Sequence, residues 1–163
     1  MEPDIETTYR RGLFLHGVLL KIQFPTMNTL VRGQMDSDVL VVDDSAAIRK
    51  ILQRVLRQTG MAIGAIHEAG DGQEALAVMG QHPVNLVLTD INMPKMDGLQ
   101  LLASLKGSAT WRTVPVVMIT TEGGEAKVSE AVRLGAAGYV RKPFTADQIK
   151  EKLTGILEPV LPL

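Results

Sequence analysis

Five polar residues share one place in the sequence pattern, because each stands at or directly after the end of a short apolar run. They are Asp43, Asp44, Asp90, Thr120 and Lys142. Three carboxylates brought together repel, at a cost of roughly 4 kcal/mol for two charges about 4 Å apart in an effective dielectric of about 20. A bound cation, a lysine or a raised pKa must offset this repulsion.

The donor set also indicates which chemistry such a cluster could perform. Carboxylate oxygens favour a hard ion such as Mg²⁺ over zinc or copper. Mg²⁺ readily shares a phosphoryl oxygen, and the lysine and the threonine could engage the remaining oxygens. The set therefore predicts a phosphoryl-accepting site in which Asp90 is the nucleophile.

Alternating strands and helices must bring these residues together. Apolar, β-branched runs predict strands at 39–42, 63–69, 84–90, 114–120 and 138–142. Helical spacing and flanking glycines predict helices after Ser45 and over 72–80, 98–105, 124–134 and 146–157. Strands that are each followed by a helix form a parallel sheet, and nearly continuous apolar strands are covered on both faces. The sequence therefore predicts a doubly wound α/β sheet whose carboxyl edge carries all five polar residues.

Two finer expectations concern the first two helices. An apolar set at helical spacing predicts a buried face on the first helix. Its members are Ile48, Ile51, Leu52, Val55 and Leu56. Gly80 is expected to close the second helix, as Gly60 closes the first.

Composition excludes several classes of function. The chain has 163 residues, about one domain, and a net charge of −1 from 17 basic and 18 acidic residues, which disfavours nucleic-acid binding by bulk charge. It contains no cysteine, so disulfides and thiolate metal sites are excluded. No uncharged apolar run reaches the roughly 18 residues that a membrane span needs.

The ordered set of motifs resembles the receiver domain of two-component response regulators. The resemblance rests on Asp43-Asp44, the segment 88–98 with its Pro94 and Gly98, Thr120, Tyr139, and Lys142-Pro143-Phe144. It covers 36–160 and is closest to single-domain chemotaxis receivers of the CheY type. It implies a flavodoxin-like sheet of five parallel strands in the order 2-1-3-4-5, with helices on both faces.

The resemblance also implies a role for each motif residue. Asp90 would be the phosphoacceptor, and Mg²⁺ would be held by Asp43, Asp44, Asp90 and the backbone carbonyl of Asn92. Thr120, Lys142 and Tyr139 would form the phosphoryl-binding and switch group. The side chains of Asn92 and Glu122 would tune dephosphorylation. The Lys142–Pro143 peptide bond is a candidate for the cis form.

The implied function is a phosphorylation-activated switch that is not an enzyme beyond its own phosphoryl transfer and autodephosphorylation. A sensor histidine kinase or a phosphotransfer protein would be the donor. Output would be binding in trans through the fourth helix, fifth strand and fifth helix, with chemotaxis as the pathway and the flagellar motor switch as the candidate target. The resemblance further implies a cytoplasmic monomer that binds neither nucleic acid nor membrane.

Several alternatives remain open at this point. A phosphorelay or another two-component pathway fits a single-domain receiver, and a pseudo-receiver would bind partners without phosphorylation. A haloacid-dehalogenase-like phosphatase requires Asp-x-Asp spacing, which the run 43–46 lacks. A nucleotide-binding module is disfavoured because no glycine-rich phosphate loop opens a helix. Thr121 could replace Thr120, Tyr139 could be plain strand packing, and Asn92 could act through its backbone alone.

The first 35 residues do not follow the receiver pattern. We divide the chain into an N-terminal extension over 1–35, a receiver over 36–160 and a tail over 161–163. Met35 stands where a receiver normally begins, which favours an upstream start or an added extension. An accessory segment that packs on the receiver is the alternative.

Overall fold

The computed structural model of the protein describes residues 14–15, 18–19, 36–121 and 123–157. The chain divides into two units, Met1–Met35 and Asp36–Leu163. In the first unit, β1 (Phe14–Leu15) pairs with β2 (Val18–Leu19) in antiparallel fashion. The predictions for the extension as a whole and for the tail 161–163 stay predictions, because most of these residues lie outside the described ones.

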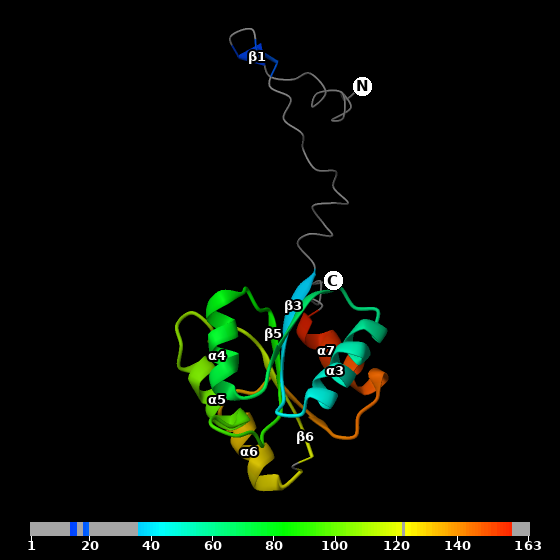
Figure 1. Cartoon of the computed structure of the whole chain (residues 1–163), viewed down its shortest axis with the longest axis vertical. Helices are drawn as coiled ribbons and strands as arrows, with labels where there is room; N and C mark the ends of the chain where they lie inside the picture. The colour runs from blue at the N-terminus through cyan, green and yellow to red at the C-terminus, as the bar shows by residue number, and fades with distance from the viewer. Residues whose placement is uncertain (1–13, 16–17, 20–35, 122, 158–163) are drawn as a thin grey trace, which may run out of the picture. The chain divides into compact units, whose positions relative to one another are not determined.

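The second unit is built on one five-stranded parallel sheet (Figure 1). Its strands are β3 (Ser37–Val42), β4 (Ile63–Ala69), β5 (Leu86–Thr89), β6 (Val116–Thr120) and β7 (Gly138–Arg141). They lie in the order β4-β3-β5-β6-β7, so the predicted order 2-1-3-4-5 is confirmed.

Helices cover both faces of this sheet, as Figure 1 shows. One layer contains α3 (Ala46–Gln58) and α7 (Ala146–Leu157). The other contains α4 (Gly72–Gln81), α5 (Gly98–Lys106) and α6 (Glu125–Arg133). Every residue of β5 and β6 is buried, which explains why these strands read as apolar runs rather than as alternating patterns. None of the described helices is long and apolar enough to cross a membrane.

The buried face of α3 is narrower than its sequence indicates. Leu52, Val55 and Leu56 are buried, but Ile51 is 45% exposed, so its predicted burial is wrong. At about 100° per residue, Ile51 lies about 90° away from the centre of the buried stripe, beyond the part of the helix that meets the sheet.

The end of α4 also differs from its prediction. The helix continues through Gly80 to Gln81, and His82 is the C-cap with an extended backbone (φ −133°, ψ 143°). Pro83 follows directly, and a proline disfavours helical backbone in the residue before it. The proline, rather than the glycine, therefore explains where α4 ends.

Candidate functional site

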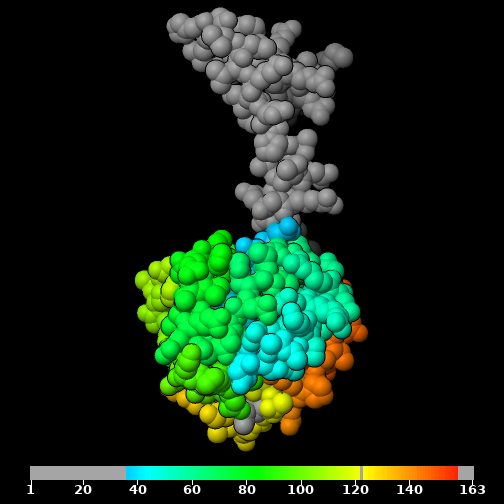
Figure 2. Space-filling view, viewed as in Figure 1, coloured from blue at the N-terminus to red at the C-terminus, as the bar shows by residue number. Residues whose placement is uncertain are grey.

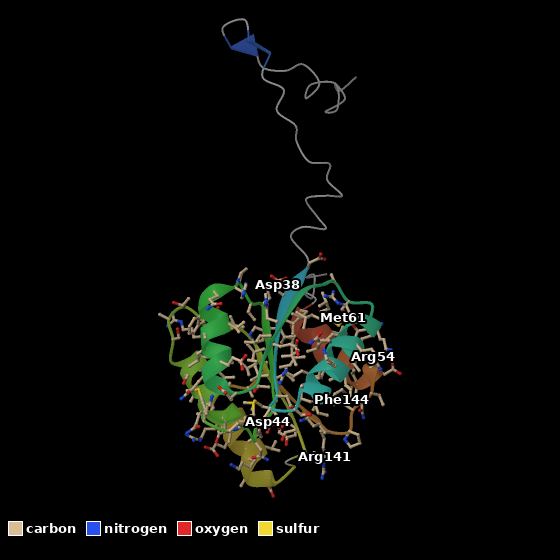
Figure 3. All side chains as sticks on the ribbon, viewed as in Figure 1. Asp38, Asp44, Arg54, Met61, Arg141 and Phe144 are labelled. Atoms are coloured by element: carbon tan, nitrogen blue, oxygen red, sulfur yellow. The ribbon has the colours of Figure 1, made fainter. Side chains whose placement is uncertain are left out.

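Strand register brings the acidic residues together at the carboxyl edge of the sheet. Val42 lies opposite Thr89, and the Asp90 amide donates a 2.9 Å hydrogen bond to the Val42 carbonyl. Carboxylate oxygens of Asp43, Asp44 and Asp90 consequently all lie within 4.8 Å of one another. In Figure 3, Asp44 lies at one end of the sheet and Asp38 at the other.

Asp43 is almost completely buried, with 1% of the residue exposed, and it is held at four points. Its amide donates to the Ala69 carbonyl at 3.1 Å, and its Oδ1 accepts from the Ser45 amide at 2.9 Å. Its Oδ2 accepts from Lys142 Nζ at 2.6 Å. Its main-chain carbonyl accepts from Arg49 Nη1 at 2.7 Å.

Lys142 supplies the positive charge of the site. Its Nζ lies 2.6 Å from Asp43 Oδ2 and 3.0 Å from Asp90 Oδ2, with 12% of the side chain exposed. Burial lowers the pKa of Lys142, but the hydrogen bonds and charge attraction from Asp43 and Asp90 outweigh it, and the pKa is raised above its ordinary value of 10.5. The ammonium therefore stays charged and offsets part of the carboxylate repulsion.

Asp90 is positioned by the loop that follows it. Its Oδ1 accepts a 2.7 Å hydrogen bond from the Ile91 amide, and 12% of its side chain is exposed. The Gly98 amide donates to the Ile91 carbonyl at 2.8 Å, which folds the loop back to the start of α5. A Cβ atom on Gly98 would overlap the main-chain carbonyl of Asp90, so this close approach requires glycine. No local pattern in the sequence indicates this contact.

The predicted switch residues surround the same edge. Thr120 is fully buried at the end of β6, and its carbonyl accepts from the Lys142 amide at 3.0 Å. Tyr139 lies opposite Met118 in the sheet and packs against the core beneath α4, α5 and α6. The Lys142–Pro143 peptide bond is cis. Glu122 lies outside the described residues, and the tuning role of Asn92 stays a prediction.

Arg49 belongs to the site and was missed by sequence reasoning. Besides its bond to the Asp43 carbonyl, its Nε lies 3.1 Å from Glu68 Oε1 on β4. The two partners are separated by 19 residues along the chain, and only the pairing of β3 with β4 brings them together. An arginine one turn into a helix carries no signal for such a contact.

The arrangement fits a hard divalent cation. Its acidic donors are all oxygens, and Asp44 is exposed to solvent while Asp43 and Asp90 are not. Oxygen donors with an open side suit Mg²⁺ or Mn²⁺, which keep several waters and share further oxygens with a bound phosphoryl group.

Comparisons with known proteins agree with this geometry. A family model described as the response regulator receiver domain matches residues 39–154. Chemotaxis protein CheY-3 of Vibrio cholerae is 39% identical over 120 residues, which cover 74% of this chain and 91% of that protein. The solved structure of CheY4 of Vibrio cholerae has a TM-score of 0.68 and 31% identity, covering 75% of this chain and 99% of that one.

A further solved structure is similar to this chain. The Mn²⁺-bound form of response regulator Rcp1 matches with a TM-score of 0.66 and 29% identity, covering 78% of this chain and 99% of that one.

The fold of this chain, the motifs at the edge of its sheet and the match to the family model lead to one conclusion. The chain belongs to the response regulator receiver domain family.

Proposed function

We propose that the receiver over 36–160 is a phosphorylation-activated signalling switch in which Asp90 accepts a phosphoryl group from a histidine kinase or a phosphotransfer protein. One observation carries this proposal. The Lys142 ammonium lies within hydrogen-bonding distance of both Asp43 and Asp90, which together with Asp44 form a cluster of three carboxylates. The proposed role is that of a signalling protein, whose only chemistry is its own phosphorylation and dephosphorylation.

The transfer itself requires a nucleophile, charge neutralisation and a place for the oxygens. A carboxylate oxygen of Asp90 attacks the phosphorus of a phosphohistidine, the new O–P bond forms, and the P–N bond breaks. The histidine nitrogen keeps the electron pair and takes up a proton. Asp43, Asp44, Asp90 and the Asn92 carbonyl would hold Mg²⁺, which would supply positive charge to neutralise the transferring group. Lys142 would pair with a phosphoryl oxygen.

The response begins with the charge that phosphorylation adds. An acyl phosphate brings negative charge and acceptor oxygens next to the buried Thr120, whose hydroxyl would turn toward them. Tyr139 would move inward behind Thr120, and the surface of α6, β7 and α7 would repack. Gly123 and Gly124 precede α6, and no side chain caps the helix start, which suits a movable element.

The surface that would change already offers a place for a partner. A hollow of about 700 Å³ lies between β7 and α7, lined by residues that include Tyr139, Arg141, Gln148, Glu151 and Lys152. On the neighbouring helix α6, Val132 is 66% exposed. These features support binding in trans at the α6, β7 and α7 surface.

Chemotaxis is the pathway that we propose, with the flagellar motor switch downstream and a cytoplasmic, monomeric receiver. It is supported by the 39% identity to chemotaxis protein CheY-3 of Vibrio cholerae. A phosphorelay is the second candidate. Capture of partners by the phosphorylated and the unphosphorylated protein would distinguish them, since a motor component would be retained by the phosphorylated form under the first proposal.

Labelling with a small phosphodonor tests the central step. With acetyl phosphate and Mg²⁺, we expect acid-stable, base-labile labelling of the wild type and none in Asp90→Asn. Asp38→Asn, at the opposite end of β3, is the matched control and should label normally. Undiminished labelling of Asp90→Asn would show that the nucleophile lies elsewhere.

A further inference from the structure

Arg49 forms a hydrogen bond with the peptide unit that joins Asp43 to Asp44. Its Nη1 donates a 2.7 Å hydrogen bond to the main-chain carbonyl of Asp43, which belongs to the same planar peptide as the Asp44 amide. The hydrogen bond to this carbonyl fixes the rotation of the peptide plane. The rotation in turn sets the direction in which the Asp44 side chain leaves the backbone.

The guanidinium is itself fixed by a second contact. Arg49 Nε lies 3.1 Å from Glu68 Oε1, and 20% of the arginine side chain is exposed. Glu68 precedes Ala69 on β4, and the Ala69 carbonyl accepts the Asp43 amide at 3.1 Å. The end of β4 therefore holds Asp43 directly through Ala69 and indirectly through Glu68 and Arg49.

The position of Asp44 explains why such a device matters. Asp43 is buried and held by several hydrogen bonds, whereas Asp44 is exposed shortly before α3. Figure 2 shows that the cyan segment around the start of α3 reaches the surface, and Figure 3 labels Asp44 at this end of the sheet. An exposed carboxylate needs a fixed backbone if it is to act as a ligand in a defined place. A planar, two-pronged guanidinium supplies that constraint, and a lysine ammonium on a flexible stem does not.

We infer that Arg49 is a positioning residue for the cation site, acting through the Asp43–Asp44 peptide rather than by touching the ion. The inference rests on the proposed function, because it assumes that this acidic pair binds Mg²⁺. Partners that hold metal ligands in place typically contribute tenfold or more to affinity. Arg49 is therefore assigned a favourable effect on Mg²⁺ binding although its own charge repels the ion.

The two effects of Arg49 have opposite signs, which makes the inference testable. Loss of a positive charge near three carboxylates strengthens the binding of a cation. Loss of the hydrogen bond to the Asp43 carbonyl weakens it under our inference. Arg49→Lys keeps the charge and removes the fork, whereas Arg49→Met removes both. Lys50→Met removes an adjacent exposed charge and is the matched control.

The experiment is a titration of the full chain with MgCl₂ alone, followed by calorimetry and by the ¹⁵N shifts of the Asp44 and Ser45 amides. All variants are measured well below their unfolding temperatures, so that a loss of stability does not change the result. We expect the Mg²⁺ dissociation constant to rise about tenfold in Arg49→Lys and to rise in Arg49→Met. Lys50→Met should bind as the wild type does, or slightly more tightly. Without Mg²⁺, the Asp44 amide should shift in both Arg49 variants.

The outcomes separate this inference from the proposed function. Wild-type affinity in Arg49→Lys, or tighter binding in Arg49→Met, would show that Arg49 acts through charge or stability and would overturn the inference alone. Failure of the wild type to bind Mg²⁺ at millimolar concentrations would overturn the cation site and the inference together. Normal Mg²⁺ binding without phosphorylation of Asp90 would contradict the proposed function but leave Arg49 in its assigned role.

Discussion

The two ends of β3 carry the same residue type in opposite situations (Figure 3). At the amino end, Asp38 Oδ1 accepts from the Ala65 amide at 2.8 Å, and the Asp38 amide donates to Asn85 Oδ1 at 2.9 Å. The Asn85 amide returns a 2.8 Å hydrogen bond to the Asp38 carbonyl. Asp38 is thus used to join three neighbouring segments of backbone.

At the carboxyl end, carboxylates face other carboxylates instead of amides. Asp43, Asp44 and Asp90 lie within 4.8 Å of one another, and Lys142 contacts two of them. One ammonium does not neutralise three carboxylates, so the cluster keeps a net negative charge that attracts a further cation. The comparison teaches that the neighbours, rather than the residue type, decide whether an aspartate is structural or chemical.

The largest expected effect concerns the glycines beside these aspartates. In Gly98→Ala, the new Cβ would overlap the Asp90 backbone, and we expect a loss of about 3 kcal/mol in the free energy of unfolding. In Gly64→Ala, the Cβ meets the Asp38 side chain, which can move at the cost of one hydrogen bond, about 1 kcal/mol. Urea unfolding measures the free energy of unfolding of both variants. Equal losses would contradict the view that the backbone contact of Gly98 with Asp90 makes the carboxyl end the less tolerant of the two.

A second pair of variants separates cation binding from stability. Asp44→Ala should weaken Mg²⁺ binding at least tenfold and, without Mg²⁺, should raise stability by up to about 1 kcal/mol, because it relieves repulsion. Asp38→Ala removes the same charge but should leave Mg²⁺ affinity unchanged and lower stability by about 1 kcal/mol. Calorimetry and urea unfolding check both, and weaker Mg²⁺ binding in Asp38→Ala would remove the contrast between the two ends.

The pH dependence of stability tests the ammonium at the carboxyl end. Because the pKa of Lys142 is raised in the folded protein, its stabilising contribution is fully present below pH 10.5 and is lost as the pH rises through the folded pKa. Compared with Lys142→Met, the wild type should keep a constant advantage from pH 7 to 10 and lose it at higher pH. A decline below pH 10 would show that burial outweighs the two aspartates.

The smallest expected effect concerns the lifetime of the phosphorylated form. A bulky basic side chain at position 92, two residues after Asp90, should restrict the attacking water and slow phosphate release several-fold in Asn92→Arg. Phosphate-release rates of the wild type and the variant give the comparison. Equal rates would show that residue 92 acts at the carboxyl end through its backbone carbonyl alone.

Much of the site could be predicted from the sequence because its determinants are local. Apolar runs identified the strands, helical spacing identified the helices, and parallel strands share a carboxyl edge, so Asp43, Asp90 and Lys142 had to approach one another. The strand order came from resemblance, since no local pattern states which strands are neighbours. The burial of Ile51 was predicted wrongly, because a periodic pattern does not show how wide a stripe the sheet covers.

Tertiary structure alone decided the contacts that depend on exact backbone placement. The close approach of Gly98 to Asp90, the bond from Arg49 to the Asp43 carbonyl and the raised pKa of Lys142 all depend on how the folded backbone is placed, even where the partners are near in sequence. Lys142 lies 99 residues from Asp43, yet the two side chains approach to 2.6 Å. The sequence determined which residues reach this edge of the sheet. The fold decided their distances, and hydrogen bonds and charge interactions depend steeply on distance.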